Sequence, residues 1–142
     1  MTPEKTISLK GKYPRLFENG ITLDCGDGWD DILDSALLVI NQHISISSNF
    51  NEVHEKTKVT QIKEKFGKLK IEFNTNDDYI YGVTNLVAHI SSNYCEVCGS
   101  RGENRSGNER AKTLCDYHQN EYLKSVIDPN QTTMFDTNGF LS

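Results

Sequence analysis

Four metal-ligand side chains stand in two closely spaced pairs in the last third of the chain, Cys95 with Cys98 and Cys115 with His118. Two residues separate the members of each pair, a spacing at which a tight turn presents both donors to one ion. Gly99 follows the second cysteine and permits the backbone reversal in which amides point at the thiolates. Three sulfur donors and one nitrogen donor suit zinc by softness and geometry. The pattern therefore predicts that these four residues bind one structural zinc ion.

The residues around these pairs predict the kind of module that holds the ion. Gly102 and Gly107 lie between the pairs and permit a hairpin, and the second pair opens a helix that we expect to continue over residues 119–127. A cysteine turn, a hairpin and then helix-borne ligands are typical of a treble-clef zinc finger. Four donors close the coordination shell, whereas a catalytic zinc keeps an open position for water. A structural role is therefore predicted, and an HNH nuclease is excluded because residues 99–114 contain no histidine.

Hydrophobic periodicity predicts an α+β domain ahead of the zinc finger. Apolar residues recur at helical spacing over residues 29–44 and again over residues 79–90. Residues 68–73 alternate apolar and charged side chains without fault, which predicts a half-buried strand. Residues 57–63 are its expected antiparallel partner, with a turn at residues 64–67. We therefore expect two helices packed on a small antiparallel β-sheet, followed by the treble-clef-like zinc finger.

Weaker signals surround these elements. Residues 1–17 contain two prolines and a glycine and are expected to be an irregular lead-in, while residues 21–25 are a candidate short strand. Asp27 is placed to cap the first helix, and Asp77 or Asn76 is placed to cap the second.

Three parts are expected along the chain: an α+β domain over residues 1–93, a zinc-finger module over 94–127 and a flexible tail over 128–142. No apolar run approaches the ~20 residues that a membrane span needs. The first residues also lack the apolar stretch of a signal peptide. We therefore expect no membrane association and a cytoplasmic location, where cysteines act as metal ligands rather than forming disulfides.

Charge is unevenly distributed in a chain whose formal net charge is −5. Residues 54–73 hold six lysines against three glutamates. A candidate partner surface combines lysines of this segment with arginines of the finger: Lys63, Lys65, Lys68, Lys70, Arg101, Arg105 and Arg110. Such side chains can meet the phosphates of a nucleic acid, although the overall acidity argues against a dedicated DNA binder. Alternatively, the lysines form a solvated strand face that discourages edge-to-edge pairing.

Cys25 and the acidic residues near it allow an enzyme hypothesis. Cys25 is a candidate nucleophile, but its glycine-rich surroundings at a helix start fit a small packed residue better. Residues 18–34 hold six acids and no base. Carboxylates at a helix N-terminus are favoured by the macrodipole and need no catalytic role, and the oxygen ligands of an EF-hand loop are missing. We therefore favour structural roles for both features and expect Trp29 to anchor the core.

Three motifs in this order resemble a known family: CGDGW at residues 25–29, QIKEKFGKLKIEF at 61–73, and CEVCG with TLCDYH between 95 and 118. The family comprises small, largely uncharacterised proteins of tailed bacteriophages and prophages, and the resemblance covers roughly residues 13–120. It implies a helix, a strand pair, a second helix and a C-terminal Cys-rich finger whose ligands fall on the four residues named above. The chain departs from the family in carrying Lys70 where arginine is common, and in its additional C-terminal tail.

The resemblance implies a phage accessory protein acting in the bacterial cytosol, but no particular activity. We therefore expect a non-enzymatic zinc-binding protein that binds a host or phage macromolecule, as a host-takeover or anti-defence factor. The alternatives are a nucleic-acid-binding protein that uses the strand lysines and the hairpin arginines, and an enzyme that uses Cys25 or the acidic cluster. The sequence predicts neither the partner nor the oligomeric state.

Overall fold

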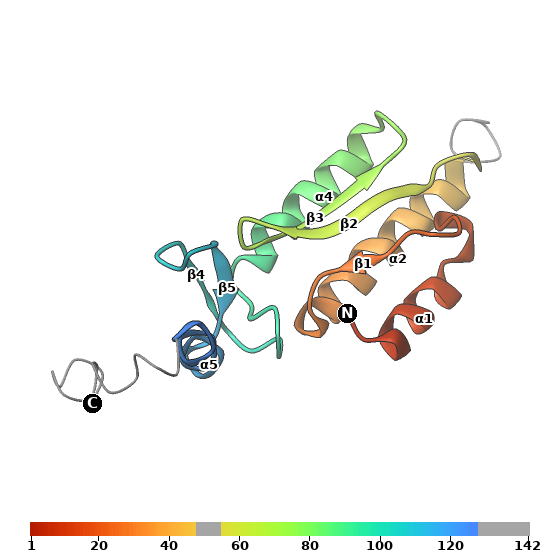
Figure 1. The fold of residues 1–142 in the computed structure, drawn as a ribbon. Coiled ribbons are helices and arrows are strands. Elements are labelled where there is room, and N and C mark those ends of the chain that lie inside the picture. The colour runs from red at the N-terminus through yellow and green to blue at the C-terminus, as the bar shows by residue number, and fades with distance from the viewer. Residues whose placement is uncertain (48–54, 128–142) are drawn as a thin grey trace, which may run out of the picture.

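The computed structural model describes residues 1–47 and 55–127, so the predicted tail lies outside the described residues. In chain order the helices and strands are α1 (Pro3–Lys12), η1 (Pro14–Leu16), β1 (Leu23–Asp24), η2 (Asp27–Trp29), α2 (Asp30–Ser47), β2 (Val59–Lys65), β3 (Lys68–Phe73), α4 (Asp78–Ser91), β4 (Glu103–Arg105), β5 (Lys112–Leu114) and α5 (Asp116–Val126). The α+β class expected from the sequence is confirmed (Figure 1).

The first sheet contains β1, β2 and β3 in that spatial order. β2 and β3 are antiparallel, as expected, and Phe66 and Gly67 turn between them with positive φ at both positions, as in type I′ hairpins. β1 is parallel to β2, with Leu23 opposite Ile62, so the prediction of a purely antiparallel sheet was wrong. The physical reason is the crossover: α2 lies between the two strands in sequence and carries the chain back along the sheet.

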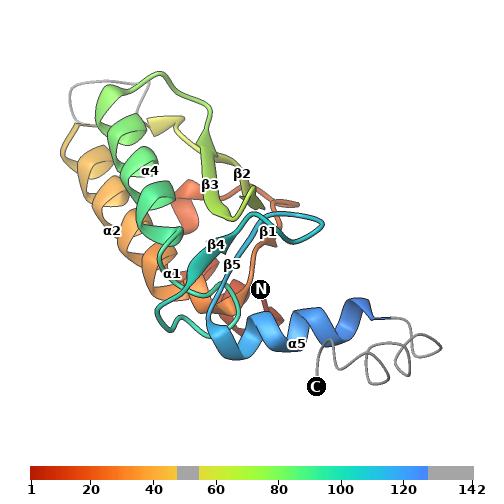
Figure 2. The same ribbon diagram turned by 90° about the vertical axis from the view of Figure 1, so that its left-hand side faces the viewer.

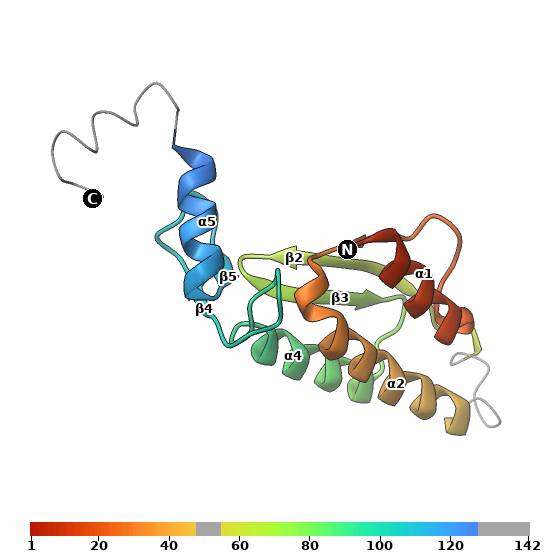
Figure 3. The same cartoon turned by 90° about the horizontal axis from the view of Figure 1, so that it is seen from below.

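The two predicted amphipathic helices form the main layer against this sheet. Figure 3 shows α2 and α4 together on one side of β2 and β3. The apolar stripe of α2 is buried, and Trp29 at its start is fully buried, as predicted for a core anchor. Asp77 caps α4, since its carboxylate accepts hydrogen bonds from the backbone N–H groups of Tyr79 and Ile80. Inward side chains of the sheet, among them Ile62 and Leu69, complete the core.

The N-terminal segment corrects a second prediction, because α1 is a regular helix rather than an irregular lead-in. Pro3 occupies the first turn, where a missing N–H costs no intrahelical bond. Gly11 lies at the helix end, and Pro14 follows it. The proline and glycine signals therefore mark the ends of a short helix. Leu9 and Tyr13 bury their side chains in the core, and packing stabilises α1 beyond its intrinsic propensity.

Acidic side chains near the start of α2 hold α1 in place. Lys5 contacts Asp30 at 2.7 Å and Lys12 contacts Asp34 at 2.8 Å. The hydroxyl of Tyr13 also donates to the Asp34 carboxylate. Asp27 does not cap α2, in contrast to the prediction; its Oδ1 accepts from the backbone N–H of Thr2 at 2.7 Å. Much of the acidic run therefore serves to attach the N-terminal helix.

Replacement of Asp34 by asparagine is expected to weaken this attachment by about 1 kcal/mol at pH 7, the net contribution of one well-placed hydrogen bond. The hydrogen bond from Lys12, followed by that from Tyr13, lowers the pKa of Asp34 below 3.8. A carboxyl whose pKa is lowered by folding stabilises the protein above its unfolded pKa and loses this effect as the pH falls through the folded value. Urea unfolding of both proteins between pH 7 and pH 2 should therefore give a difference that is constant above about pH 5 and shrinks at lower pH.

The Cys-rich C-terminal part packs directly against the α+β part. The backbone N–H of Gly28 donates to the Glu96 carbonyl at 2.8 Å, and the indole N–H of Trp29 donates to the Tyr94 carbonyl at 2.8 Å. At the far end of the sheet, the Thr113 hydroxyl donates to the Gly67 carbonyl at 2.6 Å. Figures 1 and 2 both place the β4–β5 hairpin against the turn end of the β2–β3 hairpin. The two parts are thus joined at two separate places.

Gly28→Ala is expected to destabilise the protein by at least about 3 kcal/mol, because the contacts around this glycine are backbone atoms that cannot give way. A Cβ at residue 28 would lie 2.2 Å from the Cys95 carbonyl oxygen and 2.5 Å from the Gly99 nitrogen. Gly82→Ala is the matched control: it lies on α4 with nothing within 4 Å of the added Cβ. That change should stabilise the protein by about 0.5–1 kcal/mol through helix propensity. Equal effects of the two substitutions on thermal unfolding would contradict the tight contact at Gly28.

Candidate metal centre

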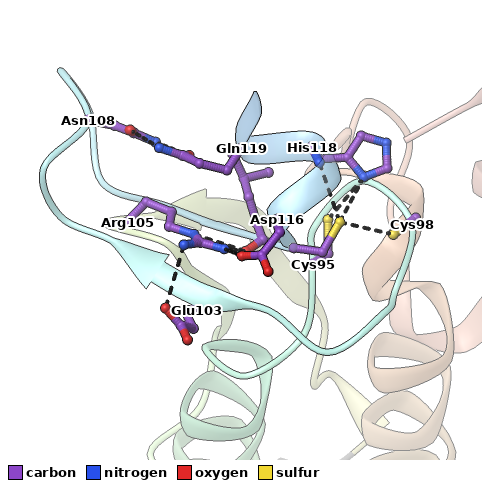
Figure 4. A network of polar contacts seen from close by, with 10 residues as sticks. Cys95, Cys98, Glu103, Arg105, Asn108, Asp116, His118 and Gln119 are labelled. Atoms are coloured by element: carbon purple, nitrogen blue, oxygen red, sulfur yellow. Dashed lines mark hydrogen bonds and ion pairs between the residues drawn. The ribbon is translucent and has the colours of Figure 1, made fainter. Parts of the chain in front are cut away.

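The four predicted ligands are presented by two local structures. Cys95 and Cys98 lie on the turn that follows α4, where the N–H of Gly99 donates to the Cys95 carbonyl at 2.8 Å. Gly99 has a φ of +78°, a conformation that glycine adopts without cost. Cys115 is the N-cap residue of α5, and His118 lies in the first turn of that helix. Figure 4 shows Cys95, Cys98 and His118 facing one another.

The donor atoms of these residues form a compact cluster. Cys95 Sγ lies 3.5 Å and Cys115 Sγ lies 3.2 Å from Nδ1 of His118, and Cys98 Sγ lies 3.8 Å from Cys115 Sγ. All four donor atoms lie within 4.8 Å of one another. Tetrahedral coordination with bonds of about 2.0–2.3 Å requires donor separations of about 3.3–3.8 Å. The cluster is therefore compatible with a metal ion at its centre.

None of the four cysteines forms a disulfide, and the 3.8 Å between the Cys98 and Cys115 sulfurs is far longer than the ~2.05 Å of a disulfide bond. Cys95 is fully buried, and burial raises the pKa of its thiol. Cys98 is exposed, and hydrogen bonds from Ser100 lower the pKa of its thiol to about 6. A buried thiolate needs a neighbouring positive charge, which a bound cation supplies.

Arg105 fixes the hairpin to the ligand-bearing start of α5. Its guanidinium donates to the Leu114 carbonyl at 3.0 and 3.2 Å and to the Asp116 carboxylate at 2.8 Å (Figure 4). A reciprocal pair of amide hydrogen bonds between Asn108 and Gln119 adds a second link. These contacts position the backbone on both sides of Cys115. Arg105 was expected to belong to a partner surface, but the structure uses it inside the module.

The other two arginines of that predicted surface have different neighbours. Arg101 is exposed and stacks its guanidinium over the ring of Tyr94 at 5.3 Å. Arg110 lines a cleft of about 800 Å³ together with Lys63 and Lys112. Of the predicted surface residues, Arg110 therefore lies near Lys63, whereas Arg101 lies against Tyr94.

The four lysines, in contrast, are brought together by the strand register. Lys63 lies directly opposite Lys70, and Lys65 lies directly opposite Lys68. Their neighbours Ile62 and Leu69 are buried, so the lysines occupy the face of the sheet that points away from α2 and α4. Of the four ammonium groups, only that of Lys70 forms an ion pair within the described ranges 1–47 and 55–127, at 3.0 Å from Glu72.

Cys25 belongs to the core and not to the group of four candidate metal ligands. It is 5% exposed and packs among apolar side chains. Burial raises the pKa of its thiol to about 12, the opposite of the shift that activates a nucleophilic cysteine. The packing interpretation of this residue agrees with its surroundings. Sequence reasoning missed its neighbour Glu96, whose carboxylate accepts from the Gly26 N–H at 3.0 Å; burial raises the pKa of this carboxyl.

Comparison of the chain with protein-family models, with curated proteins and with solved structures gave no match. Within residues 1–47 and 55–127, no helix has the length and apolar character needed to cross a membrane.

The purified protein is expected to carry about one metal ion per chain, with zinc as the predicted ion, measurable by inductively coupled plasma mass spectrometry. Cys115→Ser should abolish binding and destabilise the protein by more than about 4 kcal/mol, since loss of a structural metal is among the costliest single changes. Cys25→Ala is the thiol control: it should keep the metal and cost about 1–2 kcal/mol. Loss of metal from the Cys25 variant, or full metal content in the Cys115 variant, would contradict the assignment.

Proposed function

We propose that this chain is a non-enzymatic binding protein in which a structural zinc ion holds a treble-clef-like finger. Three thiolates and one imidazole suit zinc better than harder cations, and four protein donors leave no coordination position for a substrate or a reactive water. A cysteine turn, the β4–β5 hairpin and a helix that carries two ligands occur in the order expected of such a finger. The ion then has a purely architectural role.

The lysine face of the β2–β3 hairpin, formed by Lys63, Lys65, Lys68 and Lys70, is the proposed binding surface. Like charges directly opposite each other across two strands destabilise a hairpin, and this hairpin carries two such pairs in succession. The crowding lowers the pKa of Lys65, chiefly through Lys70. A face that served only solubility would have no need of this repulsion. An anionic partner would relieve this repulsion. The two directly opposed lysine pairs are therefore the observation that supports the proposal.

A protein is the preferred partner, since the lysine face adjoins an apolar groove. On the resemblance to phage proteins, we place the molecule in the cytoplasm of a bacterial host, bound to a host or phage protein. Nucleic acid is the second candidate, favoured by one observation: Lys63 connects the lysine face to the cleft that also holds Lys10, Arg110 and Lys112. Such a row of bases can follow a phosphate backbone. The buried Cys25 and the paired acids of α2 support a non-enzymatic role.

Neutralising one lysine pair should stabilise the hairpin while it weakens binding. In Lys65→Gln/Lys68→Gln the repulsion is gone, so the midpoint of thermal unfolding should rise at 20 mM salt. The gain should disappear at 1 M salt, where the screening length is about 3 Å. Lys56→Gln/Lys124→Gln removes two exposed lysines elsewhere and should leave the midpoint nearly unchanged. A lower midpoint in the first variant would mean that these lysines support the fold and would overturn the argument.

The two partner classes differ in their response to salt. For a protein binder we expect a fluorescent 20-nucleotide single strand to bind with a dissociation constant above about 100 µM at 150 mM salt, weaker than most non-specific DNA binding. A much lower constant that rises steeply with salt, and that is lost in Lys65→Gln/Lys68→Gln but not in the control, would favour the nucleic-acid candidate.

A further inference from the structure

A groove of about 580 Å³ runs beside β3, next to the lysine face. Its lining includes Lys68 and Lys70 from the outer side of the strand and Leu69 and Ile71 from the inner side. Residues from both sides of one strand can line the same groove only at the edge of that strand. β3 is the last strand of its sheet, so the groove follows its unpaired edge, with α4 as the opposite wall (Figure 1).

The hydrogen-bonding groups at this edge are identified by the pairing of β3 with β2. The N–H of Leu69 points away from β2, since it donates to the Ser91 hydroxyl on α4 at 2.8 Å. Backbone groups alternate between the two edges of a strand, so the N–H and C=O of Ile71 also point away from β2, as does the N–H of Phe73. No hydrogen bond to the Ile71 backbone at this edge occurs within the described part of the chain. The edge is therefore open beyond Leu69.

We propose that an extended segment of a partner protein, with acidic and apolar residues in alternation, binds here as an additional strand on β3. This proposal rests on the proposed function, because it assigns the anionic partner of the lysine face. Addition of a strand to a sheet edge draws affinity from main-chain hydrogen bonds and specificity from alternate side chains. The open part of β3, residues 70–73, can pair with a segment of about 13 Å.

The two sides of the groove determine the alternation. Every second side chain of an added strand lies on the outer side, beside Lys65, Lys68, Lys70 and Glu72. Glu72 pairs with Lys70, but the three lysines outnumber this one carboxylate and favour acidic side chains. The intervening side chains lie on the inner side, against Ile71, Ile80 and Ala88, where apolar groups are favoured. Two exposed aromatic side chains also line the groove, Phe66 at 73% and Tyr81 at 68% exposure. They supply apolar area that an occupant would cover.

Other occupants fit this edge less well. A nucleic acid has no regular row of amide donors and carbonyl acceptors to match the backbone of β3. A second copy of the chain, paired antiparallel through its own Ile71, would place Lys70 opposite Glu72 and Lys68 opposite Asn74. Glu72 already pairs with Lys70 of its own chain, so this arrangement supplies no additional carboxylate to Lys65 and Lys68.

The test uses the full-length zinc-loaded protein and a synthetic ten-residue peptide of alternating glutamate and valine, measured by NMR titration. The amide signals of Ile71 and Phe73 should shift, and the Ile71 amide should become protected from exchange. Lys68→Glu should weaken binding by at least about tenfold, whereas Lys124→Glu on α5 should not. A peptide of the same composition with its glutamates grouped together should bind at least about tenfold more weakly, since it cannot place acids on one side only.

Two N-methylated peptides test whether the backbone of the bound peptide forms hydrogen bonds with the backbone of β3. One carries N-methyl groups on its valines and the other on its glutamates, so that one set of methyl groups faces β3 and the other faces away. One peptide should lose binding by at least about tenfold, because several hydrogen bonds are lost together, and the other should bind like the parent. Equal binding of both would overturn the strand addition and leave the lysine face intact. Absence of peptide binding together with tight binding of a single-stranded oligonucleotide would overturn the protein partner itself.

Discussion

The hydrogen bond from the Gly28 N–H to the Glu96 carbonyl joins η2, which leads into α2, to the cysteine turn, and it is possible only because residue 28 has no side chain. The neighbouring bond from the Trp29 indole to the Tyr94 carbonyl ties the same turn to the centre of the core. The turn that carries Cys95 and Cys98, the first two candidate ligands, is thus held by contacts with the segment that leads into α2.

The parts of the fold that follow a simple period were predictable. α2, α4 and β3 each bury one face, so their sequences carry a repeating apolar signal. α1 was missed because Leu9 is its one buried residue, which leaves no repeating apolar signal, and because Pro3 and Gly11 suggested irregular structure. The parallel pairing of β1 was missed because a two-residue strand has no usable period, and its direction depends on the path of α2.

The candidate site also has one part that could be predicted from the sequence and another part that could not. Ligand spacing is a local property, so the four candidate metal ligands could be selected from sequence, and the structure places their donor atoms within 4.8 Å of one another. The surface residues depend on tertiary contacts. The sequence showed that lysines are frequent in one segment, but only the register places Lys63 opposite Lys70. The sequence also suggested that Arg105 is available to a partner, yet its guanidinium donates hydrogen bonds to the Leu114 carbonyl and the Asp116 carboxylate.

The contact between the Cys-rich part and the segment before α2 also affects the order in which the chain folds during synthesis. Glu96 follows Gly26 by 70 residues, and contacts between segments so distant in sequence form late in folding. When α2 leaves the ribosome, the surface around Gly26 and Gly28, which contacts the cysteine turn in the folded protein, is still exposed. On the proposed function, metal capture by the Cys-rich part and closure of this surface would complete the molecule together. Metal shortage would then leave chains whose helical layer has formed but whose surface around Gly26 and Gly28 stays exposed.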